Sequence, residues 1–211
     1  MSQSAELQRG IAQLKIVLSS DTQARLLQYL ALLQKWNKVY NLTAIHDPQQ
    51  MVSHHLLDSL AVMPHLWPKR WVDVGCGAGL PGLVLAIAQP DWQFSLLDSN
   101  SKKTSFVQQA IIELELRNAS VHCARVEDWK PTERFDGIIS RAFAELGNFL
   151  RSTRHLAAQN GRWAAMKGAP EQELAGVPDE CRVEQVIPLQ VPGLHAARSL
   201  VIATCKENEA T

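Results

Sequence analysis

The feature that most constrains the fold of this chain is a regular alternation of strand-like and helix-like segments that begins near residue 70. Short apolar runs typical of buried strands occupy 70–74, 92–97, 121–124, 137–140 and 162–166. Helical segments lie between these runs, at 80–88, 101–116 and 144–156. Strands that alternate with helices pair in parallel, and the helices cover both faces of the sheet. The sequence therefore predicts an α/β fold built on a mostly parallel sheet.

The last strand-like runs follow a different pattern because no helix separates them. A turn at Asn160 and Gly161 is expected to lead into the strand at 162–166, and two further runs cover 183–191 and 200–205. Parallel strands need a long crossover connection, whereas antiparallel strands can be joined by a short turn. We expect the last two runs to form an antiparallel hairpin at one edge of the sheet.

The part of the chain before residue 70 has only helical periodicity. Apolar side chains recur every three or four residues between Leu26 and Tyr40, which is the spacing of one helix face. Ser20 can cap this helix, and a second helical stretch begins at Asp47 and continues through Leu60. We expect a helical extension, residues 1–69, that packs on an α/β core, residues 70–211.

Composition and charge exclude several classes of protein. The chain has 46% hydrophobic and 20% charged residues, which is typical of a globular protein and excludes a disordered or collagen-like chain. No run approaches the roughly 20 apolar residues that cross a bilayer, and no secretory signal is visible. The 21 basic and 21 acidic residues balance, so binding to nucleic acid would need a local basic face.

The four cysteines are far apart and include no C-x-x-C pair. A chain of this length does not need disulfides to fold, so we expect reduced thiols and a cytoplasmic location. The sequence suggests no metal site.

A glycine-rich segment follows the first predicted strand, at 73–79 (DVGCGAG), and its glycines alternate as Gly75, Gly77 and Gly79. In an open α/β sheet, ligands bind beyond the carboxyl ends of the strands. Glycine lets the backbone approach a ligand without an intervening Cβ. A tight turn alone does not require three alternating glycines, so the segment predicts a ligand-binding loop.

The ligand predicted for this loop is S-adenosylmethionine. The dinucleotide pattern G-x-G-x-x-G is not met, because Leu80 stands at the sixth position counted from Gly75. Asp73 would repel a pyrophosphate, but it can pair with an ammonium group. S-adenosylmethionine carries an ammonium group and a ribose, and it has no phosphate. A nicotinamide-dependent oxidoreductase is therefore a weaker alternative.

Two further positions fit a nucleoside. Asp98 ends the second predicted strand, 23 residues beyond Gly75, where a carboxylate that accepts from ribose hydroxyls is expected. The alternative is that Asp98 only caps the following helix. Val126 and Glu127 follow the third strand, where their backbone groups could bond the edge of an adenine ring.

Several strings resemble a known enzyme family. The segment 73–82 (DVGCGAGLPG) looks like motif I of class I S-adenosylmethionine methyltransferases. The strings 35–43 (KWNKVYNLT), 55–59 (HLLDS), 96–99 (LLDS) and 135–142 (FDGIISRA) resemble the bacterial small-subunit ribosomal RNA guanine-N7 methyltransferases, also called the glucose-inhibited division protein B family. The likeness covers nearly the whole chain in order.

The resemblance implies a cytoplasmic enzyme with the Rossmann-like class I methyltransferase fold. Its expected reaction moves a methyl group from S-adenosylmethionine to N7 of one guanine in 16S rRNA, within the assembled small ribosomal subunit. We expect it to be a monomer that does not bind membranes. By position, the resemblance implies that the cofactor contacts Gly75, Leu80, Val126, Glu127 and Arg141.

The chain lacks the motifs that methyltransferases of other acceptor atoms use, and transfer to guanine N7 does not need those motifs. N7 carries a free lone pair and loses no proton on methylation, so no general base is needed. Methyltransferases of exocyclic amines have an Asn/Asp-Pro-Pro-Tyr string after the fourth strand, where this chain has 140–143 (SRAF). Methyltransferases of pyrimidine carbon use a cysteine that commonly follows proline, and no cysteine here does so.

Arg141, at the end of the fourth strand, is the candidate catalytic residue that orients the cofactor or the target base. The alternative is an ion pair with a core carboxylate. Candidate RNA contacts are basic residues at sheet ends and on the long helix, although each could be an ordinary surface charge. They are Lys167, His195, Arg198, Lys35 and Lys38.

The acceptor is the least constrained part of this prediction. A class I methyltransferase that acts on a protein or small molecule is the main alternative, because the cofactor half says little about the acceptor. A non-catalytic binding module is disfavoured, since a site that no longer binds the cofactor has no physical need for Asp73, the glycine loop and Asp98.

Overall fold

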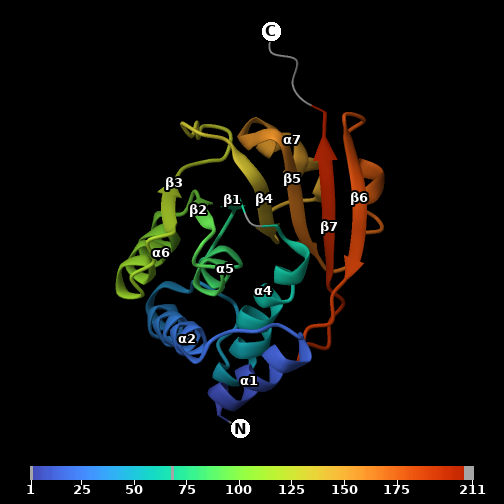
Figure 1. Cartoon of the computed structure of the whole chain (residues 1–211). Coiled ribbons are helices and arrows are strands. Elements are labelled where there is room, and N and C mark those ends of the chain that lie inside the picture. Colours follow the sequence, from blue (N-terminus) through green and yellow to red (C-terminus); the bar gives the residue numbers. More distant parts are fainter. Residues whose placement is uncertain (1, 68, 207–211) are drawn as a thin grey trace.

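A seven-stranded sheet forms the centre of the computed structural model, which describes residues 2–67 and 69–206 (Figure 1). Its strand order is β3-β2-β1-β4-β5-β7-β6. The strands are β1 (Arg70–Val74), β2 (Gln93–Asp98), β3 (Ala119–Cys123), β4 (Phe135–Arg141), β5 (Ala157–Lys167), β6 (Cys181–Pro188) and β7 (Ser199–Cys205). Strands β1 to β5 pair in parallel, whereas β7 runs antiparallel to both β5 and β6. The predicted mostly parallel sheet with an antiparallel edge hairpin is confirmed.

The sheet is covered on both faces because neighbouring residues in each strand point to opposite sides. Trp71 packs in one buried cluster with α5 (Gly82–Ala88) and α6 (Ser101–Glu113), and its neighbour Val72 packs in another with α7 (Leu146–Thr153). This alternation matches the nearly continuous apolar runs expected for strands buried on both faces.

The N-terminal residues form a set of helices, as predicted. These are α1 (Gln3–Gln13), α2 (Ser20–Tyr40), α3 (Pro48–Met51), the π-helical turn η1 (Val52–Leu57), α4 (Asp58–Leu60) and the 3₁₀ turn η2 (Met63–His65). The cap of α2 lies one residue earlier than expected, because the Ser19 hydroxyl accepts from the backbone N–H of Thr22 at 3.1 Å. Asn41 ends α2 in a left-handed conformation (φ 49°).

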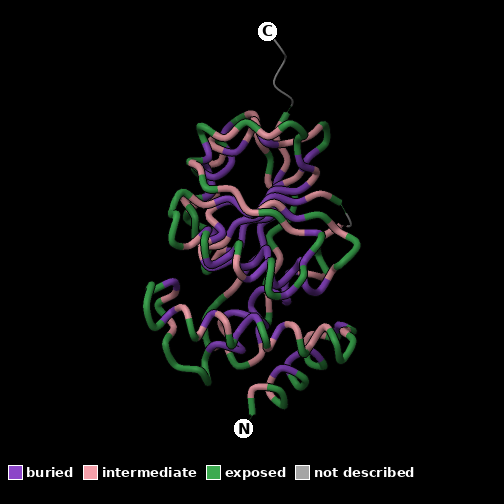
Figure 2. The backbone as a smooth tube through the Cα atoms, turned by 90° about the vertical axis from the view of Figure 1, so that its left-hand side faces the viewer, coloured by how far each residue is buried: buried purple, intermediate pink, exposed green. Residues whose placement is uncertain are grey.

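These helices pack against α5 and α6, which cover one face of the sheet, and they share one hydrophobic cluster with them. Leu30 of α2 and Leu83 of α5 are fully buried in the same hydrophobic cluster. Figure 2 shows buried backbone both in the sheet and in the N-terminal helices. The boundary at residue 70 stays a prediction. None of the described helices combines the length and the apolarity needed to cross a membrane.

The cysteine prediction is wrong for one pair. Cys181 and Cys205 lie opposite each other in the β6–β7 ladder and form a disulfide, with their Cα atoms 3.9 Å apart. Cys76 is buried and free, and Cys123 is exposed and free. The sequence spacing could not reveal the pair, because the register of the hairpin alone brings the two thiols together.

Several element boundaries differ from the prediction by a few residues. Strand β5 begins at Ala157, so Asn160 and Gly161 lie inside the strand and do not precede it. Asn160 has a positive φ of 61°, and the β4–β5 register shifts at this point, so the strand absorbs the irregularity and continues. Helix α7 begins at Leu146 and ends at Thr153, and the 3₁₀ turn η3 (Arg154–Leu156) completes the predicted helical segment.

Candidate functional site

The glycine loop lies at the carboxyl end of β1 and folds over the end of β2. The backbone N–H groups of Gly75 and Cys76 both donate to the carbonyl oxygen of Leu97, at 2.8 and 3.0 Å. Gly75 has a φ of +71°, and a Cβ there would lie 2.6 Å from the ring of Phe143. The loop therefore needs glycine at this position for both conformation and space.

A cavity of about 250 Å³ opens beside this loop. Its lining combines the ends of three neighbouring strands, and four of the predicted cofactor residues contribute to it, together with the exposed ring of Phe143. These four are Gly75, Asp98, Val126 and Glu127. The structure therefore brings together residues that are up to 52 positions apart in the sequence.

Asp98 holds two segments of this site in place. One carboxylate oxygen accepts from the backbone N–H of Gly77 at 2.9 Å, and the other accepts from the N–H of Asn100 at 2.8 Å. The N-cap of α6 is Asn100, whose side-chain oxygen accepts from the backbone N–H groups of Lys102 and Lys103. Asp98 is therefore not the helix cap that was considered as its alternative role.

Asp73 lies beneath the loop and not in the cavity lining. Its side chain is fully buried, and Oδ2 accepts from the backbone N–H of Gly82 at 2.7 Å. Oδ1 is also buried and finds no hydrogen-bond donor among the residues that the structure describes. Burial raises the pKa of Asp73 to about 7, with the bond from Gly82 opposing the shift. This unsatisfied oxygen is an acceptor that a cationic group would complete.

The remaining loop positions, Gly77, Gly79 and Leu80, do not line this cavity, and the cofactor contacts predicted for Gly77 and Gly79 stay predictions. Gly77 and Gly79 have positive φ angles of 56° and 87°, and Leu80 is buried in the hydrophobic cluster that contains α5. Leu80 therefore supports the loop from below, and its predicted contact with the cofactor stays a prediction.

Tyr29 of α2 is a site residue that the sequence interpretation missed. Its buried hydroxyl donates to the carbonyl oxygen of Ala78 in the glycine loop at 2.8 Å. Burial raises the pKa of the Tyr29 phenol, so the hydroxyl stays protonated and able to donate. The available signal was a tyrosine beside Leu30 in the apolar helix face, because a buried hydroxyl needs a polar partner.

Arg141 forms an ion pair with a core carboxylate, the alternative given for it above, and its predicted roles toward the cofactor and the target base stay predictions. Its Nη1 donates to Oδ2 of Asp58 and to the carbonyl oxygen of His54, both at 2.9 Å. Arg198 donates from Nε to the other oxygen of Asp58 at 3.0 Å. Asp58 was not singled out from the sequence, because it lies 83 and 140 residues from its two partners.

The other candidate RNA contacts lie in different surroundings. Lys167 is only 11% exposed and pairs with Glu173 at 2.6 Å, so its charge is already neutralised. His195 is exposed in the segment between β6 and β7. Lys35 and Lys38 are exposed on α2 and line a separate cavity of about 300 Å³. The RNA contacts of all four stay predictions.

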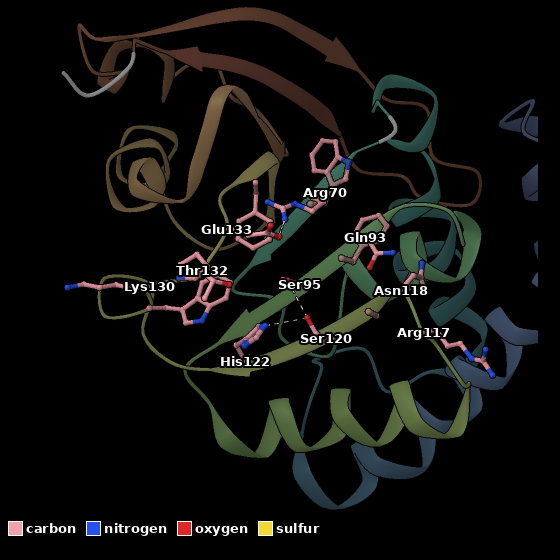
Figure 3. A pocket seen from close by; sticks show the side chains of 16 residues that line it. Arg70, Gln93, Ser95, Arg117, Asn118, Ser120, His122, Lys130, Thr132 and Glu133 are labelled. Atoms are coloured by element: carbon pink, nitrogen blue, oxygen red, sulfur yellow. Dashed lines mark hydrogen bonds and ion pairs between the residues drawn. The ribbon is translucent and has the colours of Figure 1, made fainter. Parts of the chain in front are cut away.

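A larger cavity, of about 600 Å³, lies elsewhere on the sheet and contains none of the predicted site residues (Figure 3). Its lining includes the amino ends of β1 and β2, so it is centred away from the glycine loop. The Ser120 hydroxyl forms hydrogen bonds with the Ser95 hydroxyl and with Nε2 of His122, both at 3.3 Å. Arg70 and Glu133, which also line this cavity, form an ion pair. These polar groups largely satisfy one another, so the smaller cavity beside the loop remains the candidate cofactor site.

The sequence of this chain matches one protein family over most of its length. Residues 22–202 match GidB, described as rRNA small subunit methyltransferase G. The chain is 50% identical over 202 residues to the Ribosomal RNA small subunit methyltransferase G of Laribacter hongkongensis. The alignment covers 95% of this chain and 98% of that protein. The protein of the same name from Pseudomonas aeruginosa strain UCBPP-PA14 is 52% identical over 202 residues, covering 95% and 94% of the two chains.

Solved structures with low sequence identity share the fold. TrmN from Thermus thermophilus has a TM-score of 0.57 at 14% identity, covering 74% of this chain and 53% of that chain. The ribosomal protein L11 methylase from Lactobacillus delbrueckii subsp. bulgaricus has a TM-score of 0.54 at 14% identity, covering 78% and 81%. The cyclase SpnF has a TM-score of 0.60 at 15% identity, covering 89% and 96%.

These likenesses confirm the predicted class I methyltransferase fold, and the cyclase among them shows that the fold does not set the reaction. The sequence relatives and the family match carry the more specific assignment. The chain belongs to the GidB family, the rRNA small subunit methyltransferases G.

Proposed function

We propose that this protein transfers a methyl group from S-adenosylmethionine to N7 of a guanine in 16S rRNA of the small ribosomal subunit. The observation that carries the proposal is family membership over residues 22–202, with a site whose residues suit that cofactor. The substrate implies action in the cytoplasm, and a monomer is sufficient because each site residue lies in this chain.

The described residues fit the cofactor in four respects. Gly75 has no side chain at the carboxyl end of β1, where a Cβ would clash with the ring of Phe143. Asp98 lines the cavity, and each carboxylate oxygen can accept a further bond from a ribose hydroxyl. The unsatisfied oxygen of Asp73 suits an ammonium group. Val126 and Glu127 line the cavity where backbone groups could bond adenine.

The cofactor, when bound, supplies an electrophilic methyl group on a sulfonium centre. The chain has only to bind the two reactants and hold them in line, because N7 offers a lone pair and releases no proton. No side chain is needed as a base. Arg141 lies at the end of β4, next to the strand that leads into the glycine loop, where it could orient the target base.

The acceptor is tested by methyl transfer to small ribosomal subunits from cells that lack this protein. S-adenosylmethionine with a labelled methyl group should yield labelled N7-methylguanine in 16S rRNA. The position of the modified base is mapped by cleaving the RNA strand at that base. Label that enters protein or small molecules while the RNA stays unlabelled would contradict the proposal.

The cofactor is tested separately by ligand-dependent stabilisation. S-adenosylhomocysteine should raise the melting temperature, because a ligand that binds only the folded state stabilises it. NAD should leave the melting temperature unchanged. A shift produced by NAD alone would instead favour an oxidoreductase.

A further inference from the structure

Phe143 combines two properties that no other large apolar residue combines in the part of the chain that the structure describes. It is exposed to solvent, at 37%, and it lines the cavity beside the glycine loop. The other exposed apolar residues, such as Val17 and Ile112, lie outside that cavity. An aromatic ring with an open surface at the edge of a ligand site is suited to contact a second flat molecule.

The strand order places Phe143 at the opposite end of the site from the positions predicted for adenine. In the order β3-β2-β1-β4, the segments that follow these strands lie in one row. Glu127 follows β3, and Asp98 ends β2. Gly75 follows β1, and Phe143 follows β4. A cofactor with its adenine at Glu127 and its ribose at Asp98 directs its methionine end toward Gly75, so the acceptor has to approach from the side of β4.

Two contacts hold the ring of Phe143 in place. The ring packs on the glycine loop, where a Cβ built on Gly75 would lie 2.6 Å from Cδ2 of Phe143. It also meets the ring of Phe149 in α7 edge to face, with centroids 6.3 Å apart and planes at 70°. Phe149 is buried in the core, so this contact ties the ring of Phe143 to a rigid part of the molecule.

The backbone that follows Phe143 is anchored by an ion pair. Nζ of Lys167 donates to the carbonyl oxygen of Ala144, and the same nitrogen pairs with Glu173 at 2.6 Å. Glu173 also accepts from the backbone N–H of Leu146, the first residue of α7, at 2.6 Å. The connection between β4 and α7 therefore presents Phe143 in a defined position.

Methyl transfer to N7 changes the charge of the guanine. A bond forms between N7 and the methyl carbon while the bond between sulfur and that carbon breaks, and its electron pair stays on sulfur. The positive charge moves from the sulfonium to the guanine ring, and no proton is transferred. The negative face of an aromatic ring attracts a cation, so it interacts more strongly with the methylated base than with the free base. An interaction that strengthens in the transition state raises kcat.

We propose that the target guanine stacks on the ring of Phe143, which holds the base in line with the methyl group and stabilises the charge that the base gains. This inference rests on the proposed function. In an RNA helix, N7 lies in the deep and narrow major groove that side chains cannot read, so the guanine has to leave its stack. Phe143 replaces a stacking partner that the base then loses. Arg141, two residues earlier, keeps its predicted contact with the cofactor.

Phe143→Leu and Phe143→Tyr form the first test. Leucine keeps an apolar side chain without an aromatic face, whereas tyrosine keeps the face. Phe143→Leu should lower kcat/KM for small ribosomal subunits by at least about tenfold, as for the loss of one base–aromatic stack, with both a lower kcat and a higher KM. Phe143→Tyr should keep most of the activity. Affinity for S-adenosylhomocysteine should stay unchanged in both variants.

Tyr40→Leu is the matched control. It makes the same change from an aromatic to an aliphatic side chain, at a residue of α2 that is 44% exposed and does not line the cofactor cavity. This variant should keep the kcat and the KM of the unmodified protein. A loss equal to that of Phe143→Leu would contradict a specific role of Phe143 and overturn the inference.

A series of fluorinated phenylalanines at position 143 tests the charge effect, and it stays informative if Phe143→Leu does not fold. Fluorine withdraws electron density from the ring face and leaves the shape of the side chain almost unchanged. The single-turnover rate of methyl transfer should fall with each added fluorine, because the attraction between the ring and the developing cation weakens. A ring that only packs against the loop would give one rate throughout the series, which would also overturn the inference.

Two further results would count against the inference. One is a folded Phe143→Leu protein whose kcat/KM equals that of the unmodified protein. The other is a loss of affinity for S-adenosylhomocysteine that accounts for the whole loss of activity, which would assign the ring to the cofactor. A failure of the proposed function would look different, because the unmodified protein would then not methylate small subunits at all.

Discussion

The hydroxyl of Tyr29 donates a 2.8 Å hydrogen bond to the carbonyl oxygen of Ala78, in the middle of the glycine loop. This bond links the N-terminal helix α2 to a loop 49 residues away. The N-terminal helices therefore complete the candidate cofactor site and are not an accessory to it. Their removal should disturb the loop as well as the hydrophobic core.

Replacing Tyr29 with phenylalanine should destabilise the protein and weaken cofactor binding together. The Ala78 carbonyl would lose its buried donor, which costs about 1–3 kcal/mol in the free energy of unfolding. Thermal denaturation and titration with S-adenosylhomocysteine measure the two effects. Tyr40→Phe is the control, because Tyr40 lies on the same helix but is exposed, and it should change neither quantity.

Gly75→Ala should lower cofactor affinity. Alanine at φ +71° costs roughly 1–2 kcal/mol in backbone conformation, and its Cβ would also press on Phe143. Isothermal titration with S-adenosylhomocysteine should show weakening of at least about tenfold, since 1.4 kcal/mol corresponds to a factor of ten. Gly176→Ala should be tolerated, because a Cβ at that glycine meets nothing within 4 Å and its φ is not positive. Equal effects of the two substitutions would contradict the prediction.

Asp73 should make the free energy of unfolding depend on pH between about pH 4 and pH 7. Its folded-state pKa of about 7 lies above the ordinary value of 3.8, so the folded protein holds a proton that the unfolded chain releases. The stabilisation is present below about pH 4 and is lost as the pH rises toward 7, with a slope of at most about 1.4 kcal/mol per pH unit. Denaturant unfolding of the wild type and of Asp73→Asn at several pH values isolates this contribution, which the variant should lack.

The same carboxyl should make cofactor binding depend on pH in the opposite direction. If Asp73 meets the ammonium group of the cofactor, its ionised form binds that group better, so affinity for S-adenosylhomocysteine should rise between pH 6 and pH 8. Asp73→Asn should bind weakly and show a flatter pH profile. A wild-type profile that matches the variant would mean that Asp73 does not meet the ammonium group.

Reduction of the Cys181–Cys205 disulfide should lower the melting temperature without changing cofactor affinity. The bond closes a loop across 24 residues, for which the chain-entropy estimate is about 3 kcal/mol. It lies in the β6–β7 hairpin, at the far edge of the sheet from β1 and β2. Melting curves of the double variant Cys181→Ser/Cys205→Ser, with and without reductant, test this. A melting temperature that still falls on reduction of this variant would contradict the assignment.

The sequence by itself determined the architecture and predicted where the candidate cofactor site lies. Strand and helix periods are local properties, so the order of elements and the edge hairpin were predictable. The glycines, Asp73 and Asp98 follow the ends of parallel strands, and such ends always meet at one edge of a sheet. For that reason four predicted residues do line one cavity, although they are far apart in the chain.

Only the tertiary structure decided which polar groups pair. The contacts of Asp58 with Arg141 and Arg198, of Tyr29 with Ala78, and of Cys181 with Cys205 span 24 to 140 residues. Each depends on strand register or on how the N-terminal helices pack against the rest of the chain, and none of these contacts leaves a local pattern in the sequence. Hydrogen bonds and ion pairs are set by positions accurate to within an ångström, whereas sequence periodicity specifies only which face of an element is buried.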